Sequence, residues 1–147
     1  MTRVVRLGMA VFAGLNLWWG VWARLWPGPF FDNFPGFGRR WTAAYPPYNE
    51  HLVTDLGSTF LTLGFLLAAA AFVDDRRLRR LALAGVIVFN TSHLAFHATH
   101  PGQMHGSDLT ASLATLAVGV VGPAILLGLD ALGQRSRTEV DARRLQS

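Results

Sequence analysis

The chain has 147 residues, of which 51% are hydrophobic, and its thirteen basic residues are all arginines that contribute to a formal net charge of +4. It contains no cysteine, which excludes disulfides and thiolate metal sites. The positive mean hydropathy also argues against an ordinary soluble fold.

Four long apolar runs cover residues 4–26, 52–73, 81–99 and 109–132. About 20 residues of helix cross a hydrocarbon layer ~30 Å thick, so each run is long enough to span a membrane. We therefore predict an all-α fold, an integral membrane four-helix bundle. Residues 1–134 are predicted to form its single transmembrane domain, and residues 135–147 a polar tail.

The first run follows Arg3 and Arg6, as the core of a signal peptide would. It is longer than the usual ~7–15 residues, and no small-residue cleavage site precedes Arg24. We expect this run to remain as the first helix.

The loop between the first two predicted helices is long and rich in aromatic residues. Such side chains suit the headgroup boundary, so the loop is expected on the outer membrane surface. It is either a lid over a binding site or only an anchor for the first helix. As residues that contact a substrate we predict Trp41, Tyr45 and Tyr48 in the loop, with Asn90 on the third helix.

Arginines gather before the first helix, between the second and third, and after the fourth. By the positive-inside rule, both termini and the 74–80 turn are predicted to be cytoplasmic in a multi-pass protein of the cell inner (plasma) membrane. The net charge is then explained by topology, so no nucleic-acid partner is expected. All five histidines fall on the outer side.

Polar residues recur at steps of three and four on three helices, and this spacing places them on one face of each. The stripes are His51, Asp55, Ser58, Thr59 and Thr62; Asn90, His93, His97 and His100; and Asp108, Ser112 and Thr115. Because polar groups in lipid usually turn toward the bundle interior, we expect the three stripes to face one another. Small residues such as Gly57 and Gly64 should allow close helix packing.

Two kinds of site fit these stripes, and a third interpretation is that the histidines are only polar residues of the membrane interface. In the first, a transition metal, zinc, iron or copper, is bound by ligands drawn from His51, Asp55, His93, His97, His100 and Asp108. Haem held by His51 and His97 is a less favoured variant. In the second, the same groups form a metal-free hydrogen-bonded cluster, in which Asp55 or Glu50 acts as a catalytic base.

Two segments carry a resemblance: PPYNEHLVTDLG at 46–57 and HLAFHATH at 93–100. They resemble a set of small actinobacterial four-helix membrane proteins whose activity is not established, which implies the architecture without a function. By layout alone, with no shared motif, the chain is also similar to the four-helix sterol-isomerase and sigma-2-receptor group.

The sequence thus predicts a membrane protein that binds or acts on a lipid-like hydrophobic small molecule at an outward-facing polar site. If it is an enzyme, a metal-dependent oxidoreductase, hydrolase or isomerase fits. One alternative is a metal-handling or accessory subunit of a larger membrane complex, or a homo-oligomer. Another is a metal-free isomerase-like or sterol-binding protein.

Overall fold

The computed structural model describes residues 1–73 and 75–144, with side chains up to residue 133. Its five helices are α1 (Arg3–Leu25), α2 (Pro27–Asn33), α3 (Glu50–Phe72), α4 (Arg76–Thr99) and α5 (Gly106–Arg144). Between α2 and α3 lie the short antiparallel strands β1 (Pro35–Gly36) and β2 (Arg39–Arg40) and the 3-10 turn η1 (Thr42–Ala44). Four helices, α1, α3, α4 and residues 106–133 of α5, are long and apolar enough to cross a membrane, as predicted.

Three helices begin at side chains that accept a hydrogen bond from the first turn. Thr2, Asn49 and Asp75 precede α1, α3 and α4 and accept from the backbone N–H three residues on. The cap at Asp75 starts α4 at Arg76 rather than at Leu81, so the arginines predicted to lie in the turn belong to the first turns of α4. Residue 74 of that turn lies outside the described residues.

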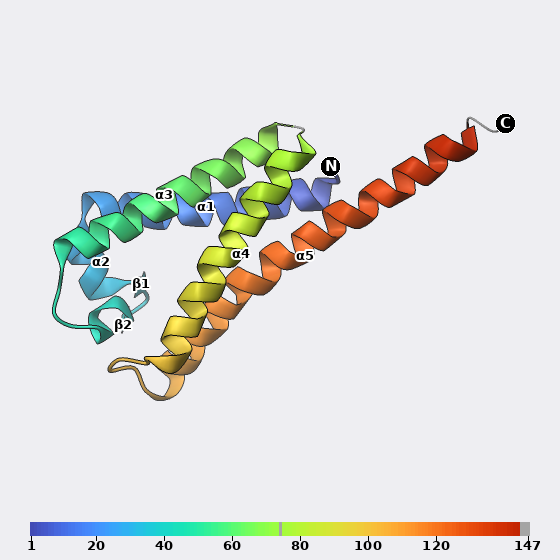
Figure 1. The fold of residues 1–147 in the computed structure, drawn as a ribbon. Helices are drawn as coiled ribbons and strands as arrows, with labels where there is room; N and C mark the ends of the chain where they lie inside the picture. The colour runs from blue at the N-terminus through green and yellow to red at the C-terminus, as the bar shows by residue number, and fades with distance from the viewer. Residues whose placement is uncertain (74, 145–147) are drawn as a thin grey trace.

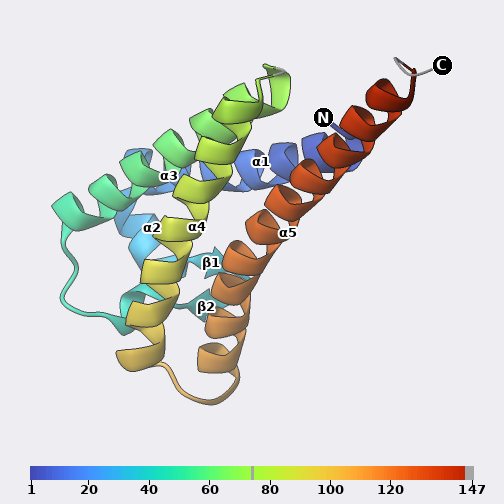
Figure 2. The ribbon, with the colours of Figure 1, turned by 45° about the vertical axis from the view of Figure 1, so that its right-hand side comes forward.

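The helices pack as two pairs, α1 along α3 and α4 along α5, which cross at an angle (Figures 1 and 2). Glycines bring the first pair together, because a Cβ at Gly57 would lie 2.8 Å from the backbone N of Arg24, and one at Gly64 would lie 2.9 Å from that of Leu17. The predicted close packing is thus confirmed at these positions. It also decides which face of α3 meets α1.

A hydrophobic core fills the end of the bundle that holds the N-terminus and the α3–α4 turn. Its largest fully buried members are Met9, Leu67 and Leu83. Beside it, Arg79 Nε lies 3.0 Å from Asp130 Oδ1, and these two side chains are only 3% and 1% exposed. This buried ion pair fastens α4 to α5.

Helix α5 runs through Pro123 and continues to Arg144. The first part of the predicted tail, residues 135–144, is therefore helical, and residues 145–147 lie outside the described residues. At the opposite end of the bundle, α2, the two strands and η1 lie near the α4–α5 loop (Figure 1).

Candidate functional site

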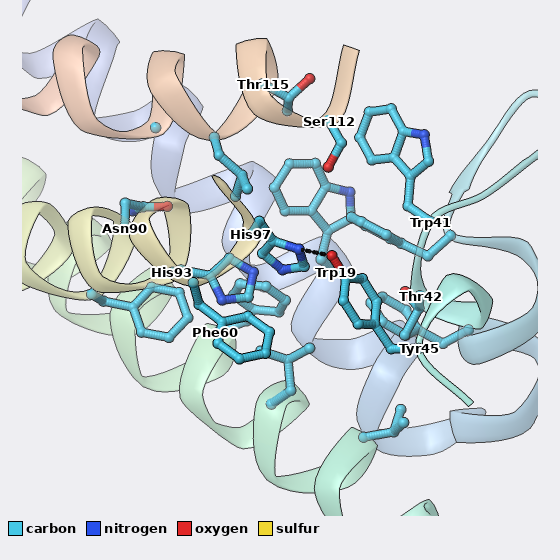
Figure 3. Close-up of a pocket in the computed structure, with 18 of the residues that line it drawn as sticks. Trp19, Trp41, Thr42, Tyr45, Phe60, Asn90, His93, His97, Ser112 and Thr115 are labelled. Atoms are coloured by element: carbon cyan, nitrogen blue, oxygen red, sulfur yellow. Dashed lines mark hydrogen bonds between the residues drawn. The ribbon is translucent and has the colours of Figure 1, made fainter. Parts of the chain in front are cut away.

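A cavity of about 500 Å³ lies between the two helix pairs, next to the segment that joins α1 to α3 (Figure 3). This volume falls within the range of small-molecule binding sites. Much of its wall is aromatic: Trp19, Phe30, Phe31, Phe34, Trp41, Tyr45, Phe60, Phe89 and Phe96. A cavity walled in this way suits a largely hydrophobic occupant.

Polar groups reach the cavity mainly from α4 and α5. His93 and His97 lie one turn apart on α4 and line the cavity together with Asn90, and Ser112 lines it from α5. Within the described part of the chain, no aspartate or glutamate lines it. The chemistry of the cavity therefore rests on imidazole, amide and hydroxyl groups.

Tyr45 connects the loop to α4 through two hydrogen bonds. Its Oη lies 2.6 Å from His97 Nδ1 and 2.8 Å from the carbonyl oxygen of His100. A carbonyl only accepts and a hydroxyl has one proton, so both bonds form together when Nδ1–H of His97 donates to Tyr45 and Tyr45 donates to the carbonyl. This arrangement leaves Nε2 of a neutral His97 as an acceptor.

Burial raises the pKa of the Tyr45 hydroxyl above its ordinary value. The phenol therefore keeps its proton at neutral pH and can donate to the His100 carbonyl. Its ring also meets that of His97 edge-on, with 5.0 Å between the ring centroids.

His93 lies between two other rings. It stacks on Phe89 at 5.5 Å between centroids and meets His97 edge-on at 4.6 Å. Within the described residues, its nitrogens form no hydrogen bond. The two neighbouring imidazoles thus offer a compact polar patch in an apolar wall.

The loop is fastened over the cavity at two places. Near α5, Asp108 forms an ion pair with Arg39 and accepts a hydrogen bond from Trp41 Nε1 at 3.3 Å. Near η1, the backbone N–H of Gln103 donates to the Ala44 carbonyl at 2.9 Å. Gly102 permits this second contact, since it has a φ of 62° and a Cβ there would lie 2.6 Å from the same carbonyl.

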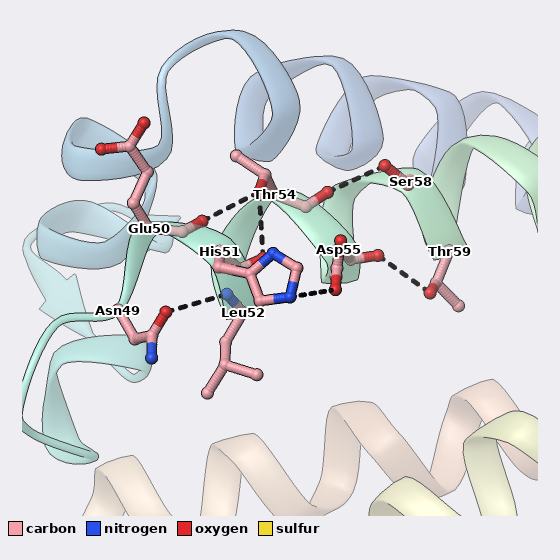
Figure 4. A network of polar contacts seen from close by, with 8 residues as sticks. All are labelled: Asn49, Glu50, His51, Leu52, Thr54, Asp55, Ser58 and Thr59. Atoms are coloured by element: carbon pink, nitrogen blue, oxygen red, sulfur yellow. Dashed lines mark hydrogen bonds and ion pairs between the residues drawn. The ribbon is translucent and has the colours of Figure 1, made fainter.

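The polar stripe of α3 faces outward, away from the cavity. His51 Nε2 lies 3.3 Å from Asp55 Oδ2, and these side chains are 80% and 62% exposed (Figure 4). Glu50, the first residue of the helix, is exposed as well. The structure therefore does not bring His51 and Asp55 together with His93 and His97.

The other predicted residues have separate environments. His100 stacks on Phe96 at 4.8 Å, with its Nδ1 2.9 Å from Thr99 Oγ1. Tyr48 packs on Phe31 at 5.2 Å, whereas Trp41, Tyr45 and Asn90 line the cavity. In the part of the chain that the structure describes, no three histidine, aspartate or glutamate side chains are placed to share a metal ion.

Several cavity residues were missed from the sequence, above all Trp19, Phe60 and Phe89. Phe60 meets Trp19 and Phe89 at centroid distances of 6.1 and 5.9 Å, and so closes the cavity between α1, α3 and α4. The sequence did contain a signal for two of them, because steps of three and four residues place side chains on one face of a helix. Phe89 precedes His93 by four residues, and Phe60 lies three residues after Gly57.

Comparison with known proteins gives no match to the chain among protein-family models, curated proteins or solved structures. The predicted resemblance to small actinobacterial membrane proteins therefore stays a prediction, and the geometry of the cavity is the basis for assigning a function.

Proposed function

We propose that this chain is a multi-pass protein of the plasma membrane that binds a lipid-like molecule carrying a hydroxyl group. The proposed topology puts both termini in the cytoplasm and the cavity in the outer half of the membrane. The observation that carries the proposal is the aromatic cavity of about 500 Å³ with His93 and His97 in its wall. An apolar pocket with a few polar groups is typical of small-molecule sites.

The preference for a hydroxyl follows from the hydrogen bonds of Tyr45. They leave Nε2 of a neutral His97 as an acceptor, and an alcohol can donate to it. An ester or ketone has only acceptors and would leave that nitrogen unsatisfied. We expect the hydroxyl to bind at His97 and the hydrophobic body to lie against the ring cluster of Trp19, Phe34 and Phe60.

Binding is favoured over isomerisation because both predicted bases lie on the exposed surface. Glu50 and Asp55 are on the outward side of α3, and the described lining contains no carboxylate. Trp41 and Tyr45 in this proposal act as a cover that retains the ligand, while Tyr48 contributes to the surface of the loop.

A metal role, with zinc, iron, copper or haem, has weaker support, since His93 and His97 are the only predicted ligands that line the cavity. The same holds for a metal-handling or accessory subunit of a membrane complex. Elemental analysis of protein purified without metal-affinity tags tests both. A transition metal near one equivalent would favour them, and less than about one-tenth equivalent would exclude a tight site.

Quenching of tryptophan fluorescence tests the proposed ligand class, because Trp19 and Trp41 line the cavity. A dibrominated 18-carbon alcohol should quench the tryptophan fluorescence of the purified protein in lipid nanodiscs at a low mole fraction of alcohol, and the quenching should saturate. The matching methyl ester should quench the fluorescence much less. His97→Leu should weaken the alcohol about tenfold, as expected when a buried hydrogen bond is lost.

His51→Leu is the matched control, since it removes an imidazole outside the cavity. It should leave alcohol binding unchanged. Equal quenching by alcohol and ester, or equal affinity of the His97 and His51 variants, would contradict the proposed recognition of a hydroxyl.

A further inference from the structure

Helix α3 turns its polar residues outward and its apolar residues inward, which is the reverse of the arrangement expected for a helix that faces lipid. Val53, Gly57, Phe60 and Gly64 are buried inside the protein, whereas the outward side carries His51, Asp55, Ser58 and Thr62, all exposed. The helix is nevertheless one of the four that can cross a membrane. Its polar side therefore needs a polar neighbour within the membrane.

The hydroxyls of this side are already satisfied as donors. Ser58 donates to the Thr54 carbonyl and Thr62 to the Ser58 carbonyl, each at 2.9 Å (Figure 4 shows the first). Asp55 is different, because among the described residues the side-chain partner of its carboxylate is His51 alone, at 3.3 Å, and Asp55 is 62% exposed. Asp55 is five residues into the helix, about 8 Å along its axis, where lipid supplies no donor.

We infer that the polar side of α3 is the interface with a second copy of this chain. The argument is complementarity along the diagonal: each copy carries an imidazole, which can donate a hydrogen bond, one turn before a carboxylate, which can accept one. Two copies insert in the same direction, and a twofold axis along the membrane normal would place their α3 helices side by side. His51 of each copy then lies about 6 Å along the axis from Asp55 of the other, within reach of two side chains.

The rest of the stripe fits the same packing. Ser58 and Thr62 are small and follow Asp55 at helical spacing, so two backbones can approach closely there. Farther along, Phe65 is 67% exposed and continues the seam with an apolar contact. The interface uses a surface separate from the cavity and does not depend on the proposed ligand.

Cysteine crosslinking in native membranes tests this interface, since the chain has no native cysteine. Thr62→Cys, twelve residues from the start of α3, should form a disulfide-linked dimer under mild oxidation. Val88→Cys is the matched control, because it is 66% exposed and lies eleven residues from the end of α4, at a similar depth. It should stay monomeric. Equal crosslinking of both variants, or crosslinks of Thr62→Cys only to another polypeptide, would overturn the inference.

Asp55→Leu tests the polar pairing itself. Energy transfer between labelled copies, followed as the protein is diluted with lipid, should show association weakened about tenfold, as expected for the loss of two symmetry-related hydrogen bonds. Circular dichroism and an unchanged thermal unfolding midpoint in detergent verify that the variant is folded, independently of the proposed ligand. Unchanged association of the folded variant would overturn the role of Asp55.

Discussion

Two helices of this protein carry pairs of polar residues four positions apart, and the two pairs have opposite environments. On α3, His51 and Asp55 contact each other on the outer surface. On α4, His93 and His97 line an aromatic cavity, and Tyr45 holds one of them. The same spacing thus produces an exposed polar pair on one helix and a cavity-lining polar pair on the other.

The neighbours of each helix account for this difference. The glycines of α3 allow α1 to approach within backbone contact on the side opposite Asp55, which turns the polar side outward. On α4, Phe89 stacks on His93 and meets Phe60 of α3 edge-on. This contact turns the side of α4 that carries His93 toward the cavity. Small and aromatic residues therefore determine which polar pair is enclosed.

The largest effect on the free energy of unfolding is expected when a carboxylic acid is placed on the buried side of α3, and removing one from the exposed side should have little effect. Val53 is 6% exposed, so Val53→Asp buries a carboxyl without a partner and should lower the free energy of unfolding by about 3 kcal/mol. Asp55→Val, on the exposed side of the helix, should change the free energy of unfolding by less than about 0.5 kcal/mol. Unfolding in mixed micelles with enough detergent to separate copies measures both. Similar losses in the two variants would mean that the two sides are not different in burial.

Removing the hydroxyl of Tyr45 should have an intermediate effect on the enclosed pair. Tyr45→Phe deletes the bonds to His97 and to the His100 carbonyl and should weaken binding of the brominated alcohol about fivefold, or about 1 kcal/mol. Tyr48→Phe is the control, because the Tyr48 hydroxyl forms no hydrogen bond within the described residues. A loss of the same size in the control would assign the effect to the loop as a whole.

The smallest effect should come from the exposed pair in a double-mutant cycle. In separated copies, His51→Ala and Asp55→Ala should be additive within about 0.5 kcal/mol, because an exposed ion pair contributes little. The corresponding cycle for Tyr45→Phe and His97→Ala should show a coupling nearer 1 kcal/mol. Coupling at His51 and Asp55 as large as at Tyr45 and His97 would remove the distinction between the pairs.

Much of the fold follows from the sequence. The apolar runs predicted all four long helices, and the short polar stretch 74–80 predicted a tight connection, which the structure has between the end of α3 at Phe72 and the start of α4 at Arg76. Spacing also placed His93 with His97, and His51 with Asp55, on shared helix faces. These are local properties, which is why the sequence alone was sufficient.

The direction of each face was harder to predict. The expectation that polar residues turn inward applied to His93 and His97 but not to Asp55, because the contact of Gly57 with α1 sets the rotation of α3. That contact joins residues far apart in the chain. The pairing of Asp108 with Arg39, 69 residues away, likewise has no local signal in the sequence.

The ion pair of Arg79 and Asp130 has a consequence for synthesis of the protein. Arg79 leaves the ribosome early in α4, and the carboxylate that meets it follows 51 residues later in α5. Helix α4 therefore reaches its final position only after α5 has been made, and the two helices take up their final packing together. The cavity, which has α5 as one of its walls, is completed only after α5 has been made.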